Sequence, residues 1–148
     1  MIDAAKATLL IQVFTTFMMV GIIWFIQIVH YPLYSKIKEG FPAYEKMHLR
    51  RTSYIVGPIM LIEAVSAIFL VGLVSDVLMA RLASLNLIFV ILIWLSTFLF
   101  QVFQHQRLAV RFSHRMHHIL LNSNWFQTIC WTCKAIILLW MLIFYLVI

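Results

Sequence analysis

Four long apolar stretches, at residues 9–29, 53–74, 82–103 and 126–148, constrain this chain more than any other feature. A transmembrane helix needs about 20 predominantly apolar residues, and each stretch is long enough. The turn at residues 75–81 is short, so the second and third helices should be antiparallel neighbours. The sequence therefore predicts an all-α polytopic membrane protein, an antiparallel four-helix transmembrane bundle, with residues 1–148 forming a single domain.

Composition excludes an ordinary soluble domain. Of the 148 residues, 64% are hydrophobic and 11% are charged, whereas soluble domains have about 45–50% apolar and about 25% charged residues. Little lies outside the apolar stretches except residues 34–52 and 104–124, so we expect no separate soluble domain. The first stretch is longer than the apolar run of a signal peptide, and residues 23–34 offer no small-residue cleavage site, so we expect this stretch to be retained.

Basic residues indicate how the chain is oriented. Two sit at one side of the predicted bundle, Lys6 and Arg81, whereas eight sit in the long connections at the other side: Lys36, Lys38, Lys46, Arg50, Arg51, Arg107, Arg111 and Arg115. The positive-inside rule then predicts that both long connections are cytoplasmic and both termini are outside. We expect the membrane to be a bacterial inner membrane. The net charge of +6 is therefore a topology signal and does not indicate nucleic-acid binding.

The two long connections differ in their patterns. Pro42 suits the first position of a helix, which we expect to run into the second span, with a kink at Pro58. In the other connection an apolar face recurs at helical spacing opposite three arginines, through Leu108, Phe112, Met116, Ile119 and Leu120. This pattern predicts an amphipathic helix lying on the inner leaflet, with the fourth span beginning at Asn124.

Two ionisable residues, Glu63 and Lys134, lie inside the apolar stretches. Each is about ten residues into its span, roughly 15 Å below the cytoplasmic surface at 1.5 Å per residue. A lone charge there costs at least about 2.5–3.5 kcal/mol, so their equal depth favours pairing. The pair is either a salt bridge that locks the bundle, or Glu63 is a proton-titrating carboxylate at the floor of a site.

Histidine is concentrated at the cytoplasmic side. His30, His48 and His105 each stand where a different helix meets the interface. Gln27 shares a face with His30, Gln101 shares one with His105, and Asn124 lies at the same depth. The other three histidines, His114, His117 and His118, fall in the amphipathic connection and are expected to face solvent or headgroups.

Several chemistries suit the three interfacial histidines. Two imidazoles from different helices can ligate haem iron axially. His30, His48 and His105 together with Glu45 or Glu63 suit iron, copper or zinc. Without a metal, the same groups form a proton relay. The sequence leaves these alternatives open, with haem or iron as the candidate cofactors.

Cys130 and Cys133 form a CxxC motif on the fourth helix. The motif resembles the cysteine pair of vitamin K epoxide reductases, which passes electrons to a quinone. That family also needs a second cysteine pair and places its thiols on the non-cytoplasmic side, and this chain offers neither. Packing of two small residues against a neighbouring helix is the favoured interpretation.

The motifs taken together resemble a group of small four-span bacterial membrane proteins of unknown function. The resemblance covers most of the chain and rests on Trp24-x-x-Gln27-x-x-His30-Tyr31-Pro32-Leu33, Phe41-x-x-Tyr44-x-x-x-His48-x-x-Arg51, Pro58, Glu63, His105 and Asn124-Trp125-x-x-Thr128-x-x-Trp131. The layout is distantly similar to the anthrone-oxygenase-like membrane family. Residues 24–32 are also distantly similar to HemJ-type protoporphyrinogen oxidases, which bind haem. These similarities imply oxidation of an aromatic or tetrapyrrole substrate.

We therefore predict a polar pocket opening toward the cytoplasm, formed by Gln27, His30, His48, Glu63, His105, Asn124 and Lys134. The leading hypothesis is an oxidoreductase acting on a hydrophobic aromatic or quinone-like molecule. Glu63, His48 and Lys134 are the candidate catalytic residues. His30, His105, Gln27 and Asn124 are candidates for binding a cofactor, together with Trp24, Tyr44 and Trp125, which are expected to line the pocket because lipid-soluble ligands favour aromatic walls.

Two further classes of function stay open. A proton-coupled transporter would use Glu63 and Lys134 at mid-depth, and four helices without a repeat would have to form a homo-oligomer to work in this way. A non-catalytic assembly subunit would use the polar cluster only for packing. In all three hypotheses the lipid bilayer is a partner of the chain.

Overall fold

The computed structural model describes residues 3–37 and 39–147, and Lys38 of the predicted basic set lies outside them. Within these residues the chain forms four helical rods. The first comprises α1 (Ala4–Phe25), a π-helical segment η1 (Ile26–His30), α2 (Tyr31–Leu33) and a 3-10 turn η2 (Tyr34–Lys36); the second is α3 (Phe41–Leu73). The third comprises α4 (Val77–Ser96), a second π-helical segment η3 (Thr97–Gln101) and α5 (Val102–Leu108), and the fourth is α6 (His114–Val147).

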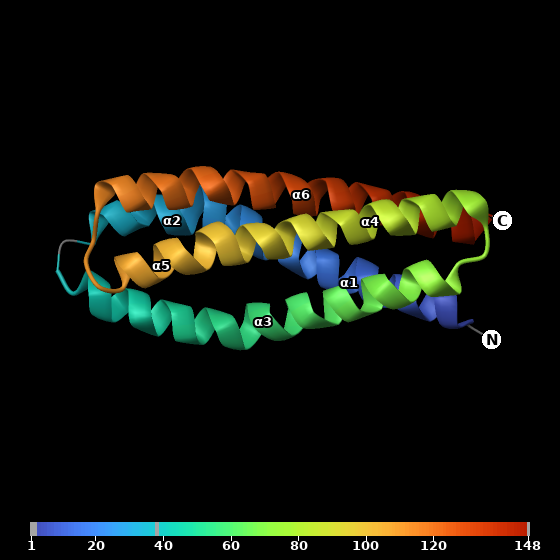
Figure 1. Cartoon of the computed structure of the whole chain (residues 1–148), viewed down its shortest axis with the longest axis horizontal. Coiled ribbons are helices and arrows are strands. Elements are labelled where there is room, and N and C mark those ends of the chain that lie inside the picture. Colours follow the sequence, from blue (N-terminus) through green and yellow to red (C-terminus); the bar gives the residue numbers. More distant parts are fainter. Residues whose placement is uncertain (1–2, 38, 148) are drawn as a thin grey trace.

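The rods are antiparallel, which confirms the predicted all-α four-helix bundle. Both ends of the chain lie beside the α3–α4 turn at one end of the bundle, and the connections at 37–40 and 109–113 lie at the other (Figure 1). Helix α1 packs against α3 and α6, and α4 packs against the same two helices. The first and third rods are therefore diagonal across the bundle.

The helices begin where the local sequence provides caps. Asp3 and Asp76 precede α1 and α4, and their carboxylates accept hydrogen bonds from the backbone nitrogens of Lys6 (2.7 Å) and Met79 (2.9 Å). These bonds satisfy amides that have no partner within the helix. Gly40 precedes α3 with φ of 71°, a left-handed conformation that glycine adopts without strain, and Pro42 follows in the first turn.

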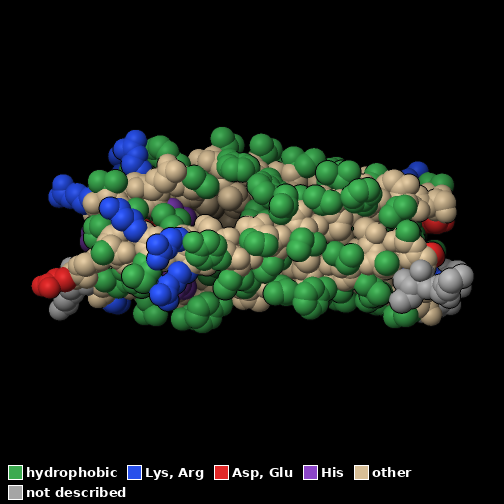
Figure 2. Space-filling view, turned by 90° about the horizontal axis from the view of Figure 1, so that it is seen from below, with side chains coloured by type: hydrophobic (Ala, Val, Ile, Leu, Met, Phe, Trp, Pro, Cys, Tyr) green, Lys and Arg blue, Asp and Glu red, His purple; other side chains and the backbone are tan. Residues whose placement is uncertain are grey.

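The outer surface is apolar over most of its length. All four rods are long and apolar enough to cross a membrane, each 32 or 33 residues in the described part of the chain. Large side chains such as Phe14 and Trp140 are more than 60% exposed, as expected for a surface that contacts lipid tails. On the face shown in Figure 2, most lysine and arginine side chains gather at the end that carries the long connections. The chain is therefore a multi-pass integral membrane protein.

The interior holds three apolar clusters in the described residues, stacked along the bundle axis. Leu9, Leu70 and Leu138 represent the cluster near the termini. Met19, Ile93 and Trp131 belong to the middle one, and Tyr34, Phe41, Leu108 and Leu120 to the one near the long connections. Buried polar side chains lie between and beside these clusters, and they form the sites described below.

The prediction of a helix lying on the inner leaflet is wrong. Helix α6 runs without interruption from His114, ten residues before the predicted start at Asn124. Leu108 and Leu120 are fully buried against Tyr34 and Phe41. An amphipathic stripe has the same periodicity whether it packs on lipid or on protein, and here it packs on the first and second rods.

Ala83 tests this packing because it is completely buried in α4 among Leu9, Leu70 and Leu138. Added methylene groups have no space to enter, so Ala83→Leu should lower the free energy of unfolding by about 1–3 kcal/mol. The measurement is SDS-induced unfolding in mixed micelles, followed by circular dichroism. Ala43→Leu, on the exposed face of α3, is the control and should unfold like the wild type; an equal transition for Ala83→Leu would contradict the packing.

Candidate functional site

The predicted ion pair between Glu63 and Lys134 is present in the middle of the bundle. Lys134 Nζ lies 2.6 Å from Glu63 Oε1, and both side chains are essentially inaccessible to solvent. The ammonium also donates to Gln12 Oε1 (3.0 Å) and to Thr16 Oγ1 (2.5 Å). An ammonium has three hydrogens to donate, so all the donors of Lys134 are in use.

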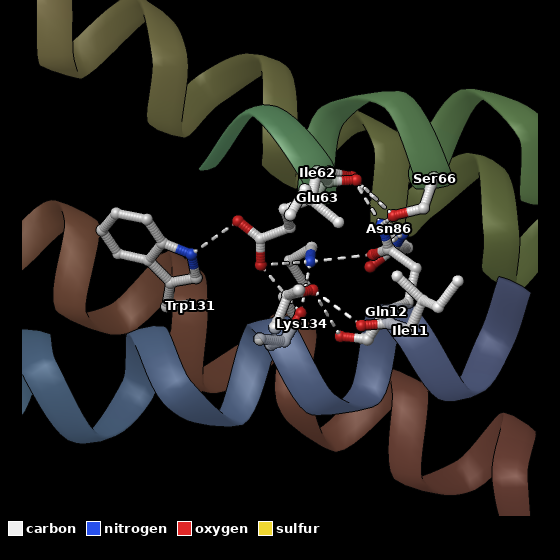
Figure 3. Close-up of polar contacts among 10 residues, drawn as sticks. Ile11, Gln12, Ile62, Glu63, Ser66, Asn86, Trp131 and Lys134 are labelled. Carbon is white, nitrogen blue, oxygen red and sulfur yellow. Dashed lines mark hydrogen bonds and ion pairs between the residues drawn. The ribbon is translucent and has the colours of Figure 1, made fainter. Parts of the chain in front are cut away.

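The partners of this pair are hydrogen-bonded in turn, although Asn86 Oδ1 has no partner among the described residues. Glu63 accepts from Thr16 Oγ1 (2.8 Å) and from the indole of Trp131 (3.1 Å), as Figure 3 shows for Trp131. The Gln12 amide nitrogen donates to the Glu63 backbone carbonyl (2.5 Å) and to Ser66 (2.6 Å), and its oxygen accepts from Asn86 (3.2 Å). We call these seven residues, Gln12, Thr16, Glu63, Ser66, Asn86, Trp131 and Lys134, the ion-pair network. It joins α1, α3, α4 and α6 and has the character of a structural lock.

A second polar group, the histidine cluster, lies near the long connections. It consists of His30, Tyr31, Tyr34, Glu45, His48, His105 and His117. Its centre is Glu45, which is fully buried and bonds through Oε1 to Nδ1 of His105. The other nitrogen of His105 lies 2.7 Å from the Tyr31 hydroxyl. A carboxylate, an imidazole and a phenol are thus connected in a row, and such a buried charge is tolerable because it is paired.

The three interfacial histidines come together although α1 and α4 are diagonal. His30 Nε2 lies 3.1 Å from His48 Nδ1, which also contacts the Thr52 hydroxyl at 3.2 Å. The ring centres of His48 and His105 are 5.8 Å apart. His105 is buried, and His30 and His48 are partly exposed; His48 of α3 lies between the other two and bridges the diagonal rods.

His117 corrects a second prediction, because it is buried rather than facing solvent. Its Nε2 lies 2.7 Å from the backbone carbonyl of Tyr31, to which it donates. His114 and His118 are exposed. The cause is the early start of α6, which turns the His117 side chain into the bundle.

Between the ion-pair network and the histidine cluster, amide side chains link the first, third and fourth rods. Asn124 Nδ2 donates to Gln27 Oε1 (2.6 Å), and Gln27 Nε2 donates to the backbone carbonyl of Leu121 (3.4 Å). Gln101 Nε2 donates to Ser123 Oγ (3.1 Å). Gln27 therefore faces α6 whereas His30 faces α3, so they do not share a face as predicted; the π-helical segment η1 makes a wider turn than an α-helix between them.

A cavity of about 250 Å³ lies between the histidine cluster and the ion-pair network. Its polar wall includes Tyr31, His48, His105, Gln101 and Asn124. Its apolar wall includes Met19, Ile23, Met60, Trp94, Phe98 and Trp131. An apolar cavity of about 150 Å³ can hold benzene, so this one has room for a substituted aromatic ring.

The cavity opens sideways, toward lipid. Ser53 and Gly57 of α3 and Phe98 and Val102 of the third rod line it, and all four are exposed on the outer surface. The mouth therefore lies between α3 and the η3–α5 segment.

The structure divides the single predicted pocket into separate parts. His48, His105 and Asn124 line the cavity, whereas His30 and Gln27 stand behind its polar wall. Glu63 and Lys134 lie beyond Trp131, which lines the cavity and donates to Glu63. They are closed off in the ion-pair network.

The aromatic residues that line the cavity also differ from the predicted ones. Trp24, Tyr44 and Trp125 are each about 40% exposed and do not line the cavity. Trp24 packs edge-on against Trp125 at 5.8 Å between ring centres and donates to Thr132. The Tyr44 ring lies outside the cavity and stacks on the His48 ring, with 6.4 Å between the ring centres. Exposed interfacial positions suit these amphipathic rings, and the cavity takes its aromatic wall from Trp94, Phe98 and Trp131 instead.

The arrangement of the described side chains does not support a metal centre. Among the described residues, no group of three or more His, Cys, Asp and Glu side chains is arranged to hold a metal ion. His105, a candidate ligand for metal or haem, has both ring nitrogens engaged, one by Glu45 and one by Tyr31. Cys130 is buried beside Trp131 in the middle apolar cluster and Cys133 is half-buried, both as free thiols.

Several residues of these sites were not predicted. Gln12 and Thr16 are four apart in the first apolar stretch, which places two polar groups on one helix face, and that spacing was a usable signal. The sequence marks Tyr31 only as part of the motif at residues 24–33, and nothing in it indicates that the Tyr31 hydroxyl meets His105. Comparison of the chain with protein-family models, curated proteins and solved structures gives no match.

The ion-pair network makes a sharp prediction for stability. Lys134→Met leaves the Glu63 carboxylate buried without its counter-charge, so the free energy of unfolding should fall by about 3–5 kcal/mol. Glu63→Gln/Lys134→Met removes both charges and should recover a large part of that loss. SDS-induced unfolding measures both, with the exposed Lys46→Met as control. If Lys134→Met alone unfolds like the wild type, the network is not the lock described here.

Proposed function

We propose that this protein is a membrane enzyme that binds a lipid-soluble aromatic or quinone-like molecule in the cavity and exchanges a proton with it. The observation that carries the proposal is His105, held by the buried carboxylate of Glu45 in the wall of a cavity that opens to lipid. Apolar pockets with a few convergent polar groups are the usual form of such sites. An oxidoreductase is the reaction class that best uses this combination: oxidation of a dihydroxylated ring to the quinone releases two protons, which the site accepts, and two electrons, which a separate one- or two-electron acceptor takes up.

Glu45 and His105 provide the proton-handling part of the proposal. An ionised carboxylate only accepts hydrogen bonds, so Nδ1 of His105 carries hydrogen toward Glu45. This contact fixes the ring and stabilises the imidazolium, as a carboxylate does for a catalytic histidine. Nε2 then faces the Tyr31 hydroxyl, and both residues line the cavity. Because both ring nitrogens of His105 are engaged, the proton passes through Tyr31: the phenol gives its hydrogen to Nε2 and takes up the proton of the bound molecule.

The features of the ion-pair network favour the enzyme over a proton-coupled transporter. A transporter of this kind needs Glu63 to change its protonation and contacts during the cycle. Its carboxylate is instead bonded to Lys134, Thr16 and Trp131 in an inaccessible network. Opening that network would leave charges unpaired inside the bilayer.

We further infer that the histidine cluster lies at the cytoplasmic end of the bundle in a bacterial inner membrane. The distribution of lysine and arginine supports this orientation through the positive-inside rule.

Labelling of single cysteines tests the orientation. The exposed residues Ser35 and Ser75, at opposite ends of the bundle, are each replaced by cysteine in a Cys130→Ala/Cys133→Ala background. In spheroplasts a membrane-impermeant maleimide should label Ser75→Cys and leave Ser35→Cys unlabelled until the membrane is lysed. The reverse pattern would invert the orientation.

Binding to the cavity is tested with a tritiated short-chain benzoquinone. The protein is placed in nanodiscs, retention of the probe is measured by scintillation proximity, and empty nanodiscs give the background. Saturable binding is expected in the wild type. Ser53→Trp fills the mouth of the cavity and should weaken binding at least about tenfold, whereas Tyr54→Trp, on the neighbouring lipid-facing position outside the cavity, should leave it unchanged. Equal affinities for the two variants, or no saturable binding, would overturn the proposal.

A further inference from the structure

Two hydrogen-bonded imidazoles, those of His30 and His48, have no role in the proton route described above. His30 Nε2 lies 3.1 Å from His48 Nδ1, and both side chains are half-buried. The row of Tyr31, His105 and Glu45 differs, because all three of its residues are buried. That row holds one proton, whereas oxidation of a dihydroxylated ring releases two. A second acceptor, with a path to the outside, is therefore needed.

The His30–His48 pair crosses the wall of the cavity. A groove of about 260 Å³ lies on the other side of this wall, between the first rod and α3, and its lining includes the exposed residues Phe25 and Ile55. His48 lines both the cavity and the groove, whereas His30 lines the groove and not the cavity. One layer of side chains separates the two hollows, since four further residues line both: Ile22, Ile26, Thr52 and Val56.

The pair lies at a level where charged side chains reach the surface. Arg50 and Arg51 are exposed and follow His48 within one turn of α3. Exposed charges are costly in hydrocarbon and belong to the headgroup region, where water is present. A proton on His30 is thus close to water, whereas a proton on His105 is enclosed.

His48 has one ring nitrogen to spare. Its Nδ1 contacts His30 and the Thr52 hydroxyl (3.2 Å), whereas its Nε2 makes no hydrogen bond within the described residues. The two nitrogens lie on different edges of an imidazole, so the Nε2 edge is directed away from His30. An imidazole takes up a proton at one nitrogen and gives up the hydrogen of the other. Nε2 is therefore the atom of His48 that is available to a molecule in the cavity.

We propose that His48 and His30 form a second proton route, which carries a proton from a molecule bound in the cavity to the outer groove. This inference rests on the proposed function and supplies the acceptor for the second of its two protons. The O–H bond of the bound hydroxyl breaks as Nε2 of His48 takes the proton, and Nδ1 of His48 gives its hydrogen to Nε2 of His30. His30 then releases a proton from Nδ1 at the groove. No electron moves in these steps.

The groups packed around the pair favour a positive charge on it. Four titratable rings have their centres 5.2–6.4 Å from the ring of His30 or His48: Tyr31, Tyr34, Tyr44 and His105. The negative charge beside them is the carboxylate of Glu45, which is bonded to His105. Its attraction stabilises an imidazolium on either histidine while the proton passes.

The test uses 2-naphthol, a lipid-soluble aromatic alcohol that becomes strongly acidic when it absorbs light. Beside a base, excited naphthol loses its proton and emits as naphtholate, at a longer wavelength than the neutral form. The protein is placed in nanodiscs, and only the emission that a short-chain benzoquinone displaces is counted. Empty nanodiscs give the background. The wild type should show displaceable naphtholate emission.

Variants then separate the two routes. Tyr31→Phe closes the first route, because it removes the hydroxyl beside His105, and naphtholate emission should persist through His48. Adding His48→Gln should reduce this emission at least about tenfold, since an amide is not a base. Adding His30→Gln instead should reduce it several-fold, because the proton stays on His48 and returns to the naphtholate. The exposed His114 lines neither hollow, so adding His114→Gln is the control and should change nothing.

The outcomes are distinct. Loss of emission on adding either His48→Gln or His30→Gln, but not His114→Gln, supports the inference. If Tyr31→Phe alone abolishes the emission, or if His30→Gln has no effect, the second route is overturned, although the proposed function stands. If the wild type binds no displaceable naphthol, or the bound naphthol keeps its proton, both fail. Thermal unfolding checks each variant, and His48→Asn replaces His48→Gln if the latter does not fold.

Discussion

A charged pair without access to water is the interaction on which this bundle depends. Glu63 and Lys134 are tolerable inside a bilayer only because each finds the other and because Gln12, Thr16 and Trp131 complete their hydrogen bonds. Helices in lipid gain little from apolar contact with one another, so polar contacts and close packing determine which faces meet. The network involves α1, α3, α4 and α6 at once, and it fixes their relative rotation. Nearer the long connections, the π-helical segments η1 and η3 then adjust the rotation of the first and third rods.

The two polar regions differ in their access to the outer surface. In the ion-pair network, the charged groups have all their partners and are essentially inaccessible. The cavity is lined by His48 and His105 and also by residues exposed on the outer surface, such as Ser53 and Phe98. Buried polar atoms without a partner among the described residues occur in both regions, for example Asn86 Oδ1 and Asn124 Oδ1, so unmet hydrogen bonds do not distinguish the two regions.

The sequence predicts how deep a residue lies along its helix, but it does not predict which direction the side chain of that residue faces. Hydropathy places the spans, and equal depth correctly pairs Glu63 with Lys134. The apolar face through Leu108 and Leu120 does not reveal whether it meets lipid or protein, so the start of α6 at His114 could not be predicted. Likewise, Trp24 and Trp125 are aromatic residues of the kind that line pockets, but they lie on the outer surface. The face of a helix that points inward depends on the helices packed around it. Candidate residues at the right depth, such as His48 and His105, were therefore found together with others that point elsewhere.

The two π-helical segments have a consequence for how this fold can change. Each of η1 and η3 accommodates an extra residue within a helix, at the level where the first and third rods enter the polar half of the bundle. Removing one residue from 26–30 would restore regular α-helix there and leave the residues on both sides close to their present faces, because the wider turn already absorbs the extra residue. The same deletion in a regular α-helical part of the rod would rotate everything after it by about 100°. The two segments are therefore places where the chain can gain or lose a residue while the spans keep their lipid-facing surface and Tyr31 keeps its contact with His105.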